Sequence, residues 1–174
     1  MKEKQKTFEE LASDPEGTIY HDEIREGVRL LILRGPVSVN AYLGVPLDHP
    51  LAGFHYNDIP LDVHGGLTFS SKGATRKTTT WPASWWWYGW DYGHAGDKSF
   101  YDLKYRSFAL RDDKAWTVEE ILHDMEWGGR YNFILLSRLA EKIWAKKSEG
   151  IKSDLGLQDE ADDLYAEHMK EAIE

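Results

Sequence analysis

The stretch Trp85-Trp86-Trp87-Tyr88-Gly89-Trp90-Asp91-Tyr92 decides the fold, because its pattern predicts one β-strand with two different faces. Side chains alternate from one side of a strand to the other along the chain. One face therefore carries Trp86, Tyr88, Trp90 and Tyr92, and the other carries Trp85, Trp87, Gly89 and Asp91. We expect the larger face to pack under the C-terminal helices.

Apolar runs before and after this strand predict the rest of an antiparallel sheet. Residues 27–34 and 37–45 form a predicted hairpin, residues 63–70 a third strand, residues 84–92 the fourth, and residues 103–110 a candidate fifth strand.

Helices are predicted mainly after the strands. Thr7 with Glu10, and Thr117 with Glu120, have the spacing of capping boxes, which predicts a helix after each threonine. The second helix is interrupted at Gly128-Gly129 and resumes with helical apolar spacing. Strands first and helices last favour a single α+β domain, with an antiparallel sheet of four to five strands and the C-terminal helices packed on one side.

The composition limits the classes of protein to which the chain can belong. Its 174 residues suit one domain, with residues 1–150 as the core and residues 151–174 as an acidic helical tail. The net charge of −9 is concentrated in that tail, so the core lacks the basic stripe that duplex nucleic acid requires. The absence of cysteine excludes disulfides, thiolate zinc sites and cysteine nucleophiles.

No signal peptide is evident at the start, and no apolar run approaches the roughly 20 residues that span a bilayer. We therefore expect a cytoplasmic protein with no membrane partner, and homo-oligomerisation stays open.

A polar series surrounds the aromatic strand. Two imidazoles and two carboxylates, from His64, Asp91, His94 and Asp97, are the ligand types of a catalytic zinc, manganese or iron site. The same groups could act without metal, as a general base oriented by a carboxylate. Asp and His in glycine-containing turns also often bond only local backbone, and the spacing matches no named metal motif. The four residues are therefore candidate catalytic residues. A divalent metal is a candidate cofactor, but simple hydrogen bonding is the favoured role of these side chains.

Backbone and basic groups near this series are candidate ligand contacts. The N–H groups of Gly65 and Gly66 could bind an oxyanion or phosphate, although glycines inside a strand also mark a bulge. Lys72, Arg76 and Lys77 lie in a loop rich in Thr and Ser, which suits either phosphate binding or simple solvation.

Indole rings are the third kind of candidate ligand contact. Trp85, Trp87 and Trp90 could stack a nucleobase, which contributes about 1–3 kcal/mol per base. The alternative for each ring is core packing, and ligand contact is favoured for Trp85 or Trp87, on the face of Asp91.

Three segments, in this order, resemble a family of bacteriophage and prophage proteins whose members mostly lack an assigned reaction. They are Tyr42-Leu43-Gly44-Val45-Pro46 with His49-Pro50, Asp62-Val63-His64-Gly65-Gly66-Leu67-Thr68-Phe69, and Gly89-Trp90-Asp91-Tyr92-Gly93-His94-Ala95-Gly96-Asp97. The resemblance implies a phage origin, and with it action in the host cytoplasm, but it implies no reaction.

Two functions are consistent with these residues. In the first, a phage-type accessory protein binds a small nucleotide-like ligand in a pocket of Trp, His and Asp, and sequesters a host defence signal. In the second, a small metal-dependent hydrolase acts on a phosphate-containing substrate through His64, Asp91, His94 and Asp97. The rings favour the first function, whereas chelator sensitivity or a histidine-like pH profile would indicate the second.

Overall fold

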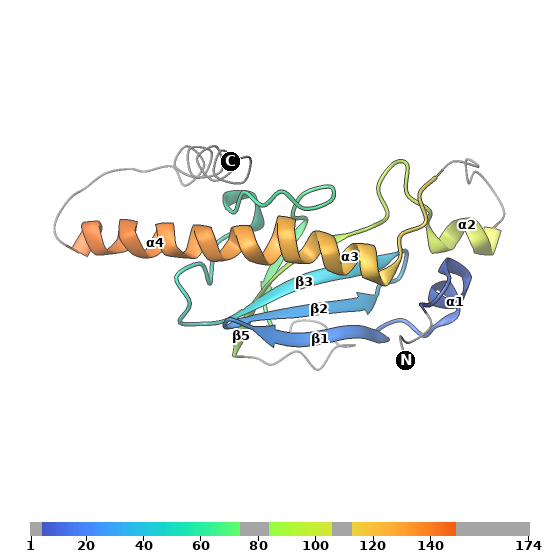
Figure 1. The fold of residues 1–174 in the computed structure, drawn as a ribbon, viewed down its shortest axis with the longest axis horizontal. Helices are drawn as coiled ribbons and strands as arrows, with labels where there is room; N and C mark the ends of the chain where they lie inside the picture. The colour runs from blue at the N-terminus through green and yellow to red at the C-terminus, as the bar shows by residue number, and fades with distance from the viewer. Residues whose placement is uncertain (1–4, 74–83, 106–112, 149–174) are drawn as a thin grey trace, which may run out of the picture.

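A five-stranded antiparallel sheet forms the centre of the fold, with strand order β1-β2-β3-β5-β4 (Figure 1). The computed structural model describes residues 5–73, 84–105 and 113–148. The strands are β1 (Ile19–Arg25), β2 (Val28–Arg34), β3 (Val39–Pro46), β4 (Phe69–Lys72) and β5 (Trp85–Asp91). This architecture confirms the predicted α+β class and the antiparallel sheet.

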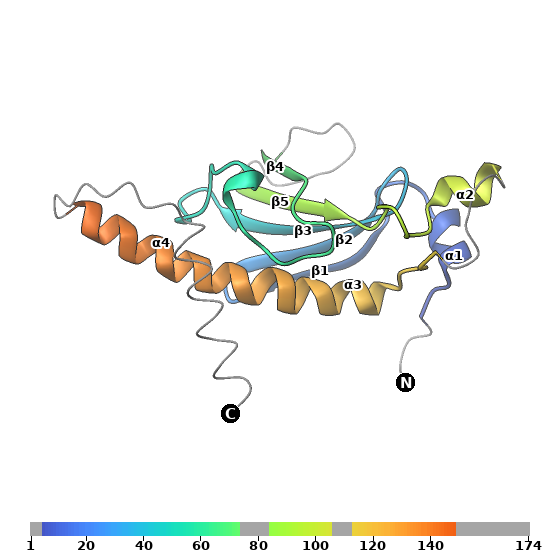
Figure 2. The ribbon, with the colours of Figure 1, turned by 90° about the horizontal axis from the view of Figure 1, so that it is seen from above.

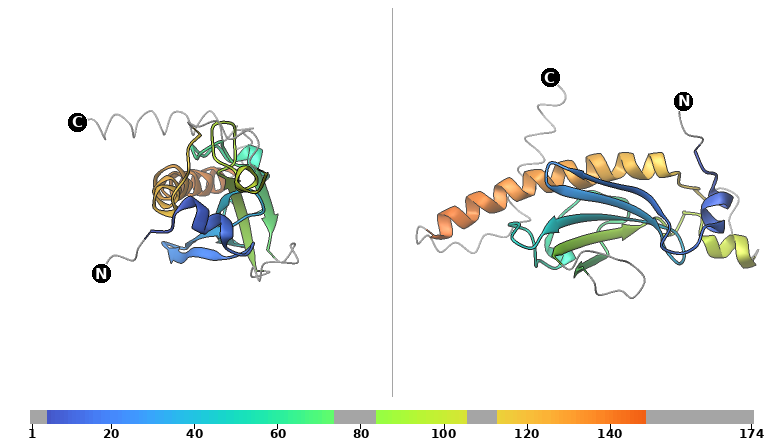
Figure 3. Two further views of the ribbon diagram at one scale, coloured as in Figure 1. Left: turned by 90° about the vertical axis from the view of Figure 1, so that its right-hand side faces the viewer. Right: turned by 90° about the horizontal axis from the view of Figure 1, so that it is seen from below.

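A long helical rod covers one face of this sheet, as the end-on view in Figure 3 shows. The rod is continuous through α3 (Val118–Asp124), the π-helical segment η2 (Met125–Tyr131) and α4 (Asn132–Ser148), and α4 runs past the end of the sheet (Figure 2). The short helices α1 (Phe8–Ser13) and α2 (Phe100–Tyr105) lie together at the other end, where the Phe8 and Phe100 rings are 5.3 Å apart. A single 3-10 turn, η1 (Tyr56–Asp58), lies in the loop after β3.

The two predicted capping boxes are present, at Thr7 before α1 and at Thr117 before α3. In each, the threonine side chain accepts from a backbone N–H of the first turn, and the glutamate side chain accepts from the backbone N–H of the threonine. These local signals therefore fix where both helices begin.

The two faces of β5 separate as the alternation predicts. Tyr88, Trp90 and Tyr92 point into the main core under the rod, together with Ile121 and Phe133. On the opposite face, Trp87 packs in a smaller buried cluster with Leu31, Leu33 and Tyr42.

Glycines make room for the large rings of this second cluster. Gly44 pairs with Trp87 across the sheet, and a Cβ atom at Gly44 would lie 2.6 Å from the Trp87 ring. Gly89 pairs with Tyr42, whose ring occupies the space of the missing Cβ atom. Trp87 and Tyr42 therefore fit because a glycine faces each of them on the paired strand.

The predicted third strand is wrong over most of its length. Only Phe69 onward pairs with β5, whereas residues 63–66 form a turn in which the Gly66 N–H donates to the Val63 carbonyl at 2.9 Å. Gly65 and Gly66 have φ angles of +69° and +76°, which lie outside the extended region of a regular strand.

The predicted strand over residues 103–110 is also wrong where it can be compared. Residues 103–105 belong to α2, whose start is fixed by the Ser99 hydroxyl, which accepts from the Tyr101 N–H, and by Asp102, which accepts from the Ser99 N–H. Residues 106–112 and the predicted acidic tail, 151–174, lie outside the described residues. β1 was not predicted, because its many charged side chains hide the alternation of an edge strand.

The Gly128-Gly129 pair does not interrupt the helix but lies in η2. A Cβ atom at Gly128 would overlap the carbonyl oxygen of Asp62, and one at Gly129 would lie 3.3 Å from the Trp90 ring. The two glycines therefore let the rod approach the segment that carries His64.

Candidate functional site

Two turns bring His64, His94 and Asp97 together at one end of β5. The first is the Val63–Gly66 turn described above. The second follows β5, where the Asp97 N–H donates to the His94 carbonyl at 2.9 Å and Gly96 has a φ angle of +94°. Both turns depend on glycine at positive φ.

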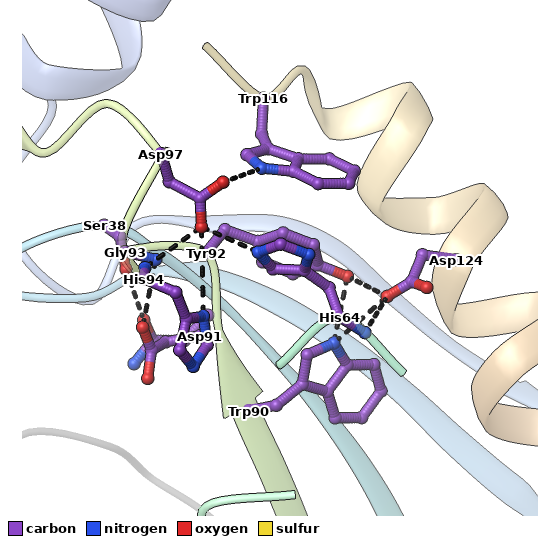
Figure 4. A network of polar contacts seen from close by, with 11 residues as sticks. Ser38, His64, Trp90, Asp91, Tyr92, Gly93, His94, Asp97, Trp116 and Asp124 are labelled. Carbon is purple, nitrogen blue, oxygen red and sulfur yellow. Dashed lines mark hydrogen bonds and ion pairs between the residues drawn. The ribbon is translucent and has the colours of Figure 1, made fainter. Parts of the chain in front are cut away.

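Asp97 is the centre of the cluster (Figure 4). Its Oδ2 atom lies 2.7 Å from Nε2 of His64 and accepts from the His94 backbone N–H at 3.0 Å, while its Oδ1 atom accepts from Nε1 of Trp116 at 2.8 Å. The Asp97 side chain is only 4% exposed, whereas those of His64 and His94 are 26% and 33% exposed. A buried carboxylate thus lies beside two imidazoles that solvent can reach.

The environment of Asp97 favours its charged form. Burial raises the pKa of Asp97, but the hydrogen bonds from Trp116, His64 and the His94 N–H lower it by more, so the pKa lies below its ordinary value of 3.8. Asp97 is therefore a carboxylate at neutral pH.

Aromatic rings fix the plane of the His64 imidazole. It stacks on Tyr92 with a ring separation of 5.3 Å and an interplanar angle of 7°, and it lies 4.7 Å from the Trp116 ring. The His94 ring meets it edge-on at 5.2 Å. In this arrangement Nε2 of His64 points to Asp97.

The cluster gathers residue types that can bind a metal ion. One ligand atom from each of His64, His94 and Asp97 can be chosen so that all three lie within 4.8 Å of one another. Nδ1 of His94 is buried, has no hydrogen-bond partner among the described residues, and lies 3.8 Å from Oδ2 of Asp97. Two imidazoles and one carboxylate are a common ligand set for zinc and for non-haem iron.

Asp91, the fourth predicted member, is not brought to this cluster. Its Oδ1 atom accepts from the Gly93 N–H at 3.0 Å, which is the local turn bond weighed as the alternative. Asp91 lies on the face of β5 opposite to Tyr92, so alternation directs it away from His64.

Gly65 has a steric role in addition to its predicted backbone role. A Cβ atom there would overlap the His94 ring, whereas a Cβ atom at Gly66 would meet nothing within 4 Å. Because both residues have positive φ, replacing either costs about 1–2 kcal/mol of backbone strain.

We therefore expect Gly65→Ala to displace the His94 ring and Gly66→Ala to leave it in place, with similar losses of unfolding free energy from backbone strain. The His94 ring signals in a two-dimensional NMR spectrum measure the displacement, and urea unfolding measures the strain. Identical His94 signals in the two variants would contradict the contact.

The indole candidates have different environments. Trp87 and Trp90 are 0% and 1% exposed and lie in the two buried clusters, so neither ring offers a face to a ligand from solvent. Trp85 is half-buried beside Trp87, with the Arg29 guanidinium 5.9 Å from its ring centre. It begins β5, roughly 20 Å from Asp91 at about 3.3 Å per residue.

The basic candidates are only partly described. Lys72 is exposed at the end of β4, on the side of the sheet edge away from the His64 turn. Arg76 and Lys77 lie outside the described residues.

Trp116 and Asp124 are site residues that the sequence did not reveal. A short bridge brings Trp116 to Asp97, because the Lys98 N–H donates to the Lys114 carbonyl and the Lys114 N–H donates to the Gly96 carbonyl, both at 2.8 Å. The available signal for Asp124 was its spacing of three residues from Ile121, which puts a carboxylate near the buried side of α3.

A surface groove of about 780 Å³ begins where Trp116 and Asp124 border the cluster. Its lining includes Lys114, Glu119, Glu120 and His123. The ammonium group of Lys114 lies 3.8 Å from the centre of the Trp116 ring and 3.1 Å from a Glu120 carboxylate oxygen. The groove is thus mixed in charge and has one aromatic wall.

No helix among the described residues combines the length and apolar character needed to cross a membrane. Comparisons with protein-family models, with curated proteins and with solved structures each found no match to the chain.

Proposed function

We propose that His64, His94 and Asp97 form a divalent metal centre, and that the protein is a small metal-dependent hydrolase. The observation that carries the proposal is the proximity of their three ligand atoms, all within 4.8 Å of one another. Three protein ligands leave metal positions free for water and substrate. A metal held in this way lowers the pKa of bound water, which becomes a nucleophile near neutral pH.

Asp97 supports this role through its contacts. Its charge is maintained by the Trp116 indole and the His94 N–H, and neither donor belongs to an imidazole ring that would bind a metal. Partners of this kind orient metal ligands and strengthen the site. The partial exposure of both imidazoles gives substrate a path to the metal.

The charge of the adjoining groove guides the choice of substrate. Three of its lining residues are the carboxylates Glu119, Glu120 and Asp124, and its lysine, Lys114, is already paired with Glu120. Such a lining repels a ligand with several negative charges. We therefore favour a phosphodiester or an ester, in which one oxygen binds the metal, over a nucleoside triphosphate.

The hydrolase is tested with bis-p-nitrophenyl phosphate and p-nitrophenyl acetate, after dialysis of the tag-free protein against Zn²⁺ or Mn²⁺. We expect turnover that EDTA abolishes and that His94→Ala reduces to the level of buffer. His55→Ala is the matched control, because His55 is an exposed histidine that belongs neither to the three-residue cluster nor to the groove. Turnover that survives both EDTA and His94→Ala would contradict the proposal.

The groove favours a second candidate function, the binding of a small ligand without chemistry. Its volume of about 780 Å³ lies within the usual range of small-molecule sites, and Trp116 supplies an aromatic wall. A phage accessory protein that sequesters a host nucleotide signal would stack its base on Trp116, and the acidic lining favours a signal with few negative charges. Thermal-shift measurements against nucleotides and cyclic dinucleotides test this function, and a shift that persists in EDTA and in His94→Ala would favour it over the hydrolase.

A further inference from the structure

One carboxylate of the helical rod, that of Asp124, accepts several hydrogen bonds next to the His64 turn. Oδ2 of Asp124 accepts from the Tyr92 hydroxyl at 2.6 Å and from the His64 backbone N–H at 3.2 Å (Figure 4). Nε1 of Trp90 lies 3.3 Å from the same oxygen and donates to the Tyr92 hydroxyl at 2.9 Å. Asp124 therefore joins α3, β5 and the His64 turn at one atom.

A second contact joins the rod to the same turn two residues before His64. Gly128, one helical turn after Asp124, lies so close to Asp62 that a Cβ atom would overlap the Asp62 carbonyl oxygen. This approach occurs in η2, where the helix is π-helical, and π-helical segments are frequent at functional sites. The rod thus contacts the chain both at His64 and just ahead of it.

The two contacts determine where the His64 imidazole can lie. The backbone N–H of His64 donates to Asp124, and its ring packs against the rings of Tyr92 and Trp116. Tyr92 is itself fixed by Asp124, because its hydroxyl donates to the carboxylate at 2.6 Å. The position of the ring thus depends on Asp124 through two contacts, one with the His64 backbone and one with Tyr92.

We propose that Asp124 and Gly128 are positioning residues, which hold His64 in the geometry that the metal requires. The inference rests on the proposed metal centre and extends it to residues that do not touch the metal. Groups that orient a metal ligand typically change metal affinity by about 10- to 100-fold when they are replaced.

The experiment measures Co²⁺ affinity and the visible absorption bands of the Co²⁺ complex in the full chain, for the wild type, Asp124→Asn and Gly128→Ala. We expect both variants to bind Co²⁺ about 10- to 100-fold more weakly and to shift the absorption bands, because His64 moves relative to His94 and Asp97. Gly128→Ala is informative because alanine favours a helix over glycine, so loss of affinity there reflects the Asp62 contact.

Glu119→Gln is the matched control, since Glu119 is an exposed carboxylate of α3 and lines the groove. We expect its affinity and its absorption bands to equal those of the wild type. Wild-type affinity and bands in both Asp124→Asn and Gly128→Ala would overturn the positioning role and leave the metal centre intact. A wild type that binds no Co²⁺ would overturn the metal centre, and the positioning role with it.

Discussion

Trp90→Ala is expected to lower the free energy of unfolding by about 3–5 kcal/mol, the usual cost of removing a buried large ring. The indole is 1% exposed, packs against Gly129 of the rod and donates to the Tyr92 hydroxyl. Its loss therefore opens a cavity and leaves part of the Asp124 network without a donor. Urea unfolding followed by circular dichroism measures the change.

Trp127→Ala is the matched control for this substitution. Trp127 is the same residue type but belongs to the rod and not to β5, and 61% of it is exposed, so we expect its removal to cost less than about 1 kcal/mol. If Trp90→Ala were as mild as Trp127→Ala, the indole would not be a core residue, and its role as a stacking surface for a ligand would regain support.

Asp97→Asn is expected to lower the free energy of unfolding by about 3 kcal/mol, because it breaks a buried network of charge-assisted hydrogen bonds. The asparagine amide cannot accept from the Trp116 indole, the His94 N–H and His64 at once, since one of its terminal atoms is a donor. Asp91→Asn is the control, because the Asp91 side chain makes a bond within its own turn, to the Gly93 N–H, and we expect a loss of no more than about 1 kcal/mol. Equal losses in the two variants would contradict the central position of Asp97.

The same substitution has an expected pH dependence. The pKa of Asp97 is lower in the folded protein than its ordinary value of 3.8, so its stabilising contribution is present above that value and is lost as the pH falls through the folded pKa. The difference in unfolding free energy between the wild type and Asp97→Asn should therefore be constant near neutral pH and shrink below pH 3.8. A difference that grows on acidification would contradict this assignment.

Local rules predicted the parts of the fold that depend on neighbours in the sequence. Alternation placed Tyr88, Trp90 and Tyr92 on the core face, and capping chemistry placed the starts of α1 and α3. The strand predicted over residues 63–70 failed because the apolar residues at its ends outweighed Gly65 and Gly66, which require a turn.

The candidate site was predictable only in part, because its contacts join distant segments. His64, His94 and Asp97 were found from residue type and glycine context. Trp116, by contrast, reaches the cluster from the segment just before α3, and Asp124 reaches it from α3 itself. Asp91 was grouped with them although the alternation that sorts the rings also separates Asp91 from Tyr92. Spacing along the chain was therefore a weaker guide than the face of the strand.

The most direct test of the metal centre is the metal content of the tag-free protein after dialysis against Zn²⁺, Mn²⁺ or Fe²⁺, measured by elemental analysis. We predict near-stoichiometric metal in the wild type and in His55→Ala, and its loss in both His64→Ala and His94→Ala. A wild type without metal, or metal that persists in both cluster variants, would contradict the assignment of His64, His94 and Asp97 as a metal centre.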